Sequence, residues 1–142
     1  MRLALALARR AARRGEVPVG AVVVAPDGRV LALAHNRVET DRDPTAHAEI
    51  LALRAAGARL GTPRLVGCDL WTTLEPCPMC AGAVGLARIR RLYFAAADPK
   101  GGGVEHGPRV LASRGHGPEV YGGIGESEAA GLLRAFFAGL RG

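Results

Sequence analysis

The chain is poor in aromatic residues and has few cysteines. Only 4% of its 142 residues are aromatic although 49% are apolar, and much of the apolar content is alanine. We therefore expect one domain spanning residues 1–142, with a thin core. Three cysteines cannot form a complete disulfide framework, which argues against a disulfide-stabilised secreted scaffold.

Long hydrophobic runs are also missing. No stretch is long enough to span a membrane, which requires about 20 apolar residues. The apolar stretch Leu3–Ala8 is shorter than the core of a signal peptide, and arginines follow it at once. We read this stretch as the beginning of a first helix. The expected protein is therefore cytoplasmic and does not bind membranes.

Lysine is almost absent, because Lys100 is the only one. The net charge of +6 comes almost entirely from arginine, whose planar fork suits phosphates and stacked bases. A GC-rich genome would enrich arginine together with alanine, glycine and proline, so the charge permits a nucleic-acid partner without requiring one. If RNA is the partner, we expect contacts from the first helix and from Arg90 and Arg91.

The hydrophobic pattern predicts alternating helices and strands. Residues 19–34 read as a β-hairpin, and residues 69–95 read as a strand–helix–strand unit whose two strands must be parallel. Other helices are expected at residues 3–14, at residues 47–59 and near the end of the chain, and Glu119–Tyr121 is a short fifth strand. The predicted fold class is α/β, a three-layer α/β/α sandwich with a mixed five-stranded sheet.

Two irregular segments and the last helix complete this prediction. Asn36–Pro44 reads as a polar loop, in which Asp43 or Thr45 caps the helix that follows. Residues 96–118 form a long irregular segment, and loops of that length in a compact domain usually carry function or are disordered. An apolar stripe predicts that the last helix packs on the sheet. Its members are Leu132, Leu133, Phe136, Phe137 and Leu140.

The residues that carry chemistry are His47, Glu49, Cys77 and Cys80. Both thiols fall at the start of a predicted helix, where unpaired N–H groups favour thiolates, and His47 starts another helix. Residues two apart point to different sides of a helix, so His47 and Glu49 can face one centre only at its first turn. A catalytic zinc site has three protein ligands and leaves a position for water, whereas a structural site has four.

Non-catalytic interpretations remain open at this point. A CxxC pair in a cytosolic protein is often redox-active. A structural zinc site would need a fourth ligand from Cys68, His106 or His116, none of which has the spacing of a known motif. Together, the His47-Ala48-Glu49 segment and the cysteine pair predict three zinc ligands, His47, Cys77 and Cys80, with Glu49 as the proton carrier. A non-enzymatic zinc or redox module is the alternative from a different class.

The pattern His-x-Glu followed by Pro-Cys-x-x-Cys is recognised as the known signature of zinc-dependent nucleobase deaminases. The chain resembles the cytidine-deaminase-like superfamily, and most closely its bacterial tRNA-specific adenosine deaminases, over nearly its whole length. The similar segments are Glu16–Ala21, Asn36-Arg37, Asp43–Ile50, Leu74–Ala83, Arg88-Ile89 and Asp98–Lys100.

This resemblance implies a homodimeric enzyme that uses Zn²⁺ to convert the wobble adenosine of an arginine tRNA anticodon loop to inosine, with release of ammonia. It implies the catalytic role of Glu49 and substrate contacts from Asn36, Ala48, Asp98 and Lys100. After Lys100 the sequence departs from many members of the family. A deaminase of free guanine, cytosine or a nucleoside is therefore kept as an alternative, and His106 and His116 have no assigned role.

Overall fold

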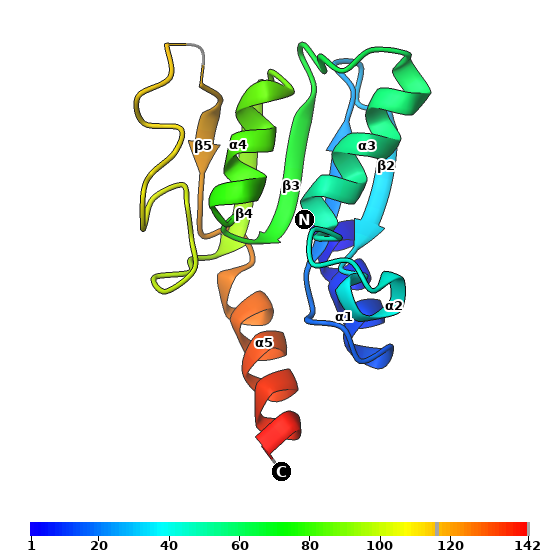
Figure 1. The fold of residues 1–142 in the computed structure, drawn as a ribbon, viewed down its shortest axis with the longest axis vertical. Coiled ribbons are helices and arrows are strands. Elements are labelled where there is room, and N and C mark those ends of the chain that lie inside the picture. Colours follow the sequence, from blue (N-terminus) through cyan, green and yellow to red (C-terminus); the bar gives the residue numbers. More distant parts are fainter. Residues whose placement is uncertain (116, 142) are drawn as a thin grey trace.

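The computed structural model describes residues 1–115 and 117–141 and contains a mixed five-stranded sheet (Figure 1). The strands lie in the order β2-β1-β3-β4-β5. Their bounds are β1 Gly20–Val24, β2 Val30–His35, β3 Asp69–Leu74, β4 Arg91–Ala96 and β5 Glu119–Tyr121. The predicted sheet is therefore confirmed, including its short fifth strand.

Strand directions follow from the connections between the strands. Strand β1 is antiparallel to β2, its hairpin partner, and to β3 on its other side. Strands β3 and β4 are parallel, as the helix between them requires, and β5 is parallel to β4. The carboxyl ends of the three parallel strands consequently lie at one edge of the sheet, where the helix and loops after them begin.

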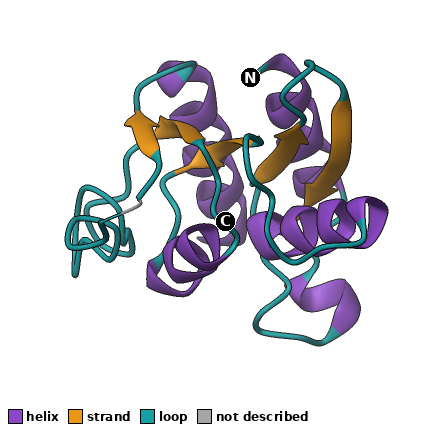
Figure 2. Cartoon of the chain, turned by 90° about the horizontal axis from the view of Figure 1, so that it is seen from above, coloured by secondary structure: helices purple, strands orange, loops and turns teal. Residues whose placement is uncertain are grey.

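Helices cover both faces of the sheet (Figure 2). Helices α1 (Arg2–Arg13) and α5 (Glu126–Arg141) lie on one face and touch each other. Helices α3 (Ala48–Leu60) and α4 (Pro78–Leu86) lie side by side on the opposite face. This arrangement confirms the three-layer sandwich. No helix among the described residues combines the length and the apolar character needed to cross a membrane.

Small residues let the layers approach closely. The α1/α5 side of the sheet is packed by Leu5, Ala95, Ala96 and Ala129. At Gly20, where α1 crosses β1, an added Cβ would collide with the backbone carbonyl oxygen of Ala4. The α3/α4 side has the larger cluster, and Phe94 is the buried aromatic side chain within it. Alanine therefore replaces aromatic bulk in this core, as the composition suggested.

Two details of the fold differ from the sequence-based expectation. The predicted loop Asn36–Pro44 contains a short helix, α2 (Val38–Asp41). The side chain of Asp43 does not cap α3, because its Oδ1 accepts hydrogen bonds from the backbone N–H and the hydroxyl of Thr45. The N-cap position of α3 is His47 itself, without a side-chain cap. Because the N-cap is not part of the regular helix, the imidazole can turn towards α4.

Candidate metal centre and active-site pocket

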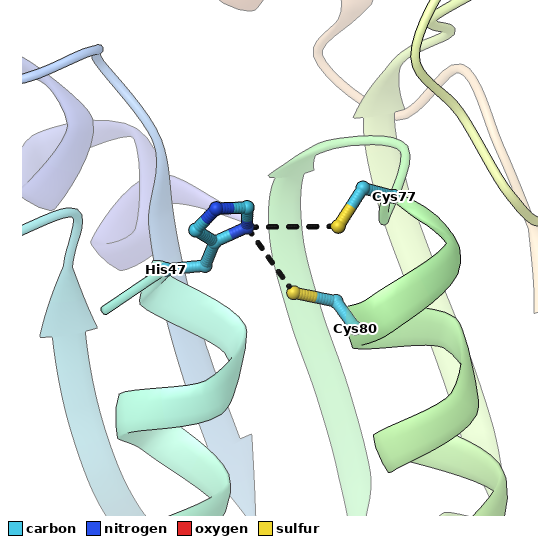
Figure 3. A group of neighbouring side chains, drawn as sticks. All are labelled: His47, Cys77 and Cys80. Atoms are coloured by element: carbon cyan, nitrogen blue, oxygen red, sulfur yellow. Dashed lines mark hydrogen bonds between the residues drawn. The ribbon is translucent and has the colours of Figure 1, made fainter. Parts of the chain in front are cut away.

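Three metal-ligating side chains meet where α3 and α4 begin (Figure 3). His47 and Cys77 are the N-cap residues of these helices, and Cys80 lies in the first turn of α4. Nδ1 of His47 is 3.6 Å from Sγ of Cys77 and 3.5 Å from Sγ of Cys80. Nitrogen and sulfur atoms bound to one tetrahedral zinc ion are about 3.5 Å apart, given bonds of about 2.0 to 2.3 Å. The donor set therefore fits zinc.

The electrostatics of the two thiols favour a cation between them. A hydrogen bond from the Cys80 thiol lowers the pKa of Cys77 to about 4, although burial acts in the opposite direction. The same bond, together with burial, raises the pKa of Cys80. The hydrogen bond to Cys77 raises the pKa of His47. Zinc binds thiolates, so metal binding at these residues releases thiol protons.

Glu49 lies one position beyond the start of α3 and is only 4% exposed. It lines the same pocket as His47 and Cys77. Burial raises the pKa of Glu49 to about 7, although the cationic form of His47 opposes the shift. A carboxyl group that titrates near neutral pH can both accept and release a proton during a reaction.

Asn36 follows β2 and is buried at the wall of this pocket. Its Oδ1 accepts a hydrogen bond of 2.8 Å from the backbone N–H of Ala48. This bond fixes the orientation of the side-chain amide, because oxygen and nitrogen cannot exchange places without losing it. The amide nitrogen is consequently left to donate hydrogen bonds to a ligand in the pocket.

The pocket has a volume of 530 Å³, within the range of small-molecule sites. One wall comes from the segment after α1 and from α2, and another from the loop after β4. A third wall is formed by α5 through Phe136, Phe137 and Leu140. A buried carboxyl group, an oriented amide and two of the three metal-ligating residues, His47 and Cys77, therefore line one cavity that is large enough for a nucleoside.

The comparison with protein families agrees with this geometry. A model of the cytidine and deoxycytidylate deaminase zinc-binding region matches residues 1–96. The chain belongs to this family. Zinc is therefore its cofactor, and hydrolytic deamination is its type of reaction, in agreement with the His, Cys, Cys donor set.

Individual relatives extend the likeness beyond residue 96. The chain is 55% identical to a tRNA-specific adenosine deaminase of Agrobacterium fabrum, over 96% of this chain and 91% of that protein. A solved structure from studies of A-to-I editing by tRNA:A34 deaminases has a TM-score of 0.90 and 55% identity, covering 94% and 97% of the two chains. A guanine deaminase from Nitrosomonas europaea has a TM-score of 0.84 and 32% identity, covering 95% and 81%.

The other substrate contacts expected from sequence lie at different depths in this deaminase. Asp98 lines the pocket. Lys100 lines an adjoining hollow of 500 Å³, which also contains Asp98 and Phe137. Ala48 is fully buried behind Asn36, to which its N–H is already bonded. His106 is bonded to Glu75, and His116 lies outside the described residues.

Sequence reasoning gave no role to two buried carboxylates that line the pocket, Glu16 and Glu75. Glu16 accepts hydrogen bonds from two backbone N–H groups at α2 and from the hydroxyl of Thr40. Glu75 binds the segment after β4 in the same way. Both lie in segments similar to the family, but a glutamate in a sequence does not show which distant amides it will bind.

The interpretation of the last helix was wrong in its second half. Ala129 is buried against the sheet, and Leu132 and Leu133 are partly buried there. However, Phe137 is 42% and Leu140 69% exposed, because α5 extends past the edge of the sheet (Figure 1). An apolar stripe shows that one face of a helix is apolar, and it does not show how far the sheet beneath it reaches.

Glu49→Gln is expected to stabilise the metal-free protein at alkaline pH. Burial raises the pKa of Glu49 to about 7, whereas an unfolded glutamate titrates near 4.3. The unfolded chain therefore loses this proton first, and wild-type stability falls between about pH 4 and pH 7. At about 1.4 kcal/mol per pKa unit, the variant should gain roughly 3 kcal/mol at about pH 8, relative to any difference at about pH 4.

Urea unfolding of chelator-treated protein at both pH values measures this change. A difference between variant and wild type that is the same at both pH values would show that the carboxyl group titrates normally.

Proposed function

We propose that the chain hydrolyses the wobble adenosine of a tRNA anticodon, most specifically that of an arginine tRNA, to inosine and ammonia. The observation that carries this proposal is the buried Glu49, which lines one pocket with His47 and Cys77, the residues that meet Cys80 as a metal-ligand group. The choice of tRNA is supported by the Agrobacterium relative, whose likeness covers almost the whole of both chains.

Each pocket residue has a distinct part in the proposed reaction. His47, Cys77 and Cys80 would hold the zinc ion, which would lower the pKa of a bound water molecule from about 15.7 towards 7. A carboxylate oxygen of Glu49 would take a proton from the attacking water, whose oxygen bonds to the ring carbon bearing the amino group. Glu49 passes the proton to the adjacent ring nitrogen. Glu49 would then take the proton of the hydroxyl group added to the ring carbon and give it to the amino group. The amino group leaves as ammonia as that oxygen becomes the carbonyl.

Asn36 orients the base for this attack. Its amide nitrogen is directed away from Ala48 by the hydrogen bond at its oxygen, so it donates to an acceptor nitrogen of the purine. Bases of an anticodon loop are unpaired and can be extruded into such a pocket, which an internal base pair would prevent. Phe136 and Phe137, at the pocket wall, offer apolar surface to the extruded nucleotide.

Arg13 and Arg14 place positive charge beside the pocket. They end α1, directly before the pocket residues Gly15 and Glu16. Arg90 and Arg91 instead form ion pairs with acidic partners at the opposite end of the sheet, so we restrict the predicted phosphate contacts to α1.

Arg13→Glu is therefore expected to weaken binding of an anticodon stem-loop about five- to tenfold at about 0.1 M salt, and to reduce the salt slope of log K by about 1. Fluorescence anisotropy over a salt series measures both quantities. Arg64→Glu is the matched control, since Arg64 is exposed in the loop before β3. Equal weakening in both variants would mean that net charge, and not contact, governs binding.

We also propose that two copies of the chain form a homodimer through the groove between α3 and α4. This groove has a volume of 640 Å³ and an apolar lining that includes Ile50, Leu53 and Leu86. Leu86 is 70% exposed in the single chain, and a second copy would cover it. Sedimentation equilibrium tests the dimer. We propose a cytoplasmic location as well, because that is where a tRNA substrate would be met.

Deamination of a free base is the second candidate, favoured by the likeness to the Nitrosomonas guanine deaminase. One experiment separates the two. The protein is incubated with an arginine tRNA anticodon stem-loop and, in parallel, with guanine, cytosine and adenosine. Inosine is measured by mass spectrometry and ammonia by a coupled assay. Inosine in the RNA supports the proposal, and ammonia from a free base with unchanged RNA overturns it.

A further inference from the structure

The carboxylate of Glu75 is the centre of a hydrogen-bond network outside the reaction described above. Glu75 is 1% exposed and directly precedes the loop that holds Cys77. Its Oε1 accepts from the N–H of Asp98 at 3.0 Å. Its Oε2 accepts from the N–H groups of three consecutive residues, at 3.2, 2.9 and 3.0 Å. These residues are Val104, Glu105 and His106.

A fifth donor to this carboxylate is a side chain. Nδ1 of His106 lies 2.7 Å from Oε1 of Glu75. Because the carboxylate can only accept, the Nδ1 atom of the imidazole carries the hydrogen. The other four donors are backbone amides, which no side-chain substitution removes. The imidazole of His106 is therefore the one donor that a substitution can delete while Glu75 and the backbone N–H groups stay in place.

The network folds residues 98–106, here called the wall segment, against the metal-binding loop. The N–H of Gly103 donates to the carbonyl oxygen of Pro76 at 2.8 Å. A Cβ at Gly103 would lie 2.6 Å from the nitrogen of Pro78, and one at Gly102 would lie 2.5 Å from Oε2 of Glu75. Two adjacent glycines are thus needed for the close approach of the wall segment to this loop.

The wall segment also reaches the substrate side. Asp98 and Gly101 line the pocket, and Lys100 lines the hollow beside it. His106 lines neither of these cavities. Its influence on a bound substrate must therefore pass through Glu75 and the backbone of the wall segment.

We propose that the Glu75–His106 pair fixes the wall segment in the conformation that binds substrate, and that His106 is a positioning residue for substrate affinity. This proposal rests on the proposed function for its substrate, an anticodon stem-loop. Charge-assisted hydrogen bonds to a buried carboxylate are stronger than neutral ones, so loss of the imidazole should loosen the wall.

The kinetic experiment compares four variants on the zinc-loaded protein. His106→Ala should raise KM for the stem-loop about tenfold, as expected when one hydrogen bond to a charged group is lost, with less than about a twofold change in kcat. His106→Asn should restore KM to within about twofold, because its amide N–H can replace Nδ1–H. His106→Gln should not, because its longer side chain places the amide near the position of Nε2. Glu105→Gln is the matched control, since its side chain is exposed and its N–H bond to Glu75 is kept.

A second measurement needs no substrate. Hydrogen–deuterium exchange should show that the amides of Val104, Glu105 and His106 exchange at least about tenfold faster in His106→Ala than in wild type, and nearly normally in His106→Asn. Zinc content, measured by atomic absorption, should remain at the wild-type level in all variants.

Three results would overturn the proposal. One is faster exchange with an unchanged KM, which would separate the wall segment from affinity. Another is a parallel loss of kcat and zinc in His106→Ala, which would make the pair a support of the metal loop only. The third is unchanged exchange. Should wild-type protein fail to deaminate the stem-loop, the proposed function fails, whereas the exchange measurement still decides whether the pair holds the wall segment.

Discussion

Glu49→Gln is expected to lower kcat by about two to four orders of magnitude, the range typical for loss of a general acid–base group. Glutamine nearly preserves the volume of the side chain but cannot accept a proton from water or return it to the leaving amine. Glu49 is the acidic residue in the first turn of α3, next to His47, and it is buried. Single-turnover inosine formation measures the effect.

The control for this result is a second glutamate of the pocket. Glu39 lines the pocket from α2 but is exposed. Glu39→Gln should lower kcat by less than about tenfold, well below the loss expected of a proton carrier. Zinc content should be equal in both variants. Comparable losses at Glu49 and Glu39 would show that general negative charge matters and would remove Glu49 from its proposed role.

Cys80→Ala is expected to remove zinc and, with it, activity. Mutation of a residue that only hydrogen-bonds to a metal ligand already lowers metal affinity about 10- to 100-fold. Loss of a direct ligand should therefore lower the affinity by more than about 100-fold. Two donors, His47 and Cys77, would remain, and they are too few for a stable site. Zinc analysis after dialysis against a weak chelator measures the loss.

Cys68→Ala is the matched control, because Cys68 is also a buried, free cysteine but belongs to the hydrophobic core. It should keep zinc at the wild-type level. Zinc loss in both variants would trace the effect to instability, and zinc retained in Cys80→Ala would exclude Cys80 as a ligand.

Features that depend on residues close together in the sequence could be predicted, whereas contacts between distant residues could not. The strand–helix–strand unit required parallel β3 and β4, and the same local rules placed His47 and Cys77 at helix starts. These are statements about neighbouring residues, which periodicity and helix capping govern. The three layers followed from how such units pack, whereas the order of the strands came from the structure.

What the sequence did not predict depends on partners far along the chain. Glu75 and its donors are separated by 23 to 31 residues, and nothing local in a glutamate identifies the amides it will bind. The end of α5 is a similar case. Its apolar stripe continues to Leu140, but the sheet ends before this residue. The sequence pattern of a helix does not show how long the strands beneath it are.

Because α5 extends past the sheet, its first turns serve folding and its last turns serve the pocket. Ala129 anchors the helix in the core, whereas Phe136, Phe137 and Leu140 line the pocket from beyond the sheet. Surface substitutions away from packed features usually change stability by no more than about 0.5 kcal/mol. Substitutions among the pocket residues at the end of α5 can therefore change substrate recognition with little effect on the stability of the fold. Selection can act on recognition in the last turns of α5 while the first turns stay constrained.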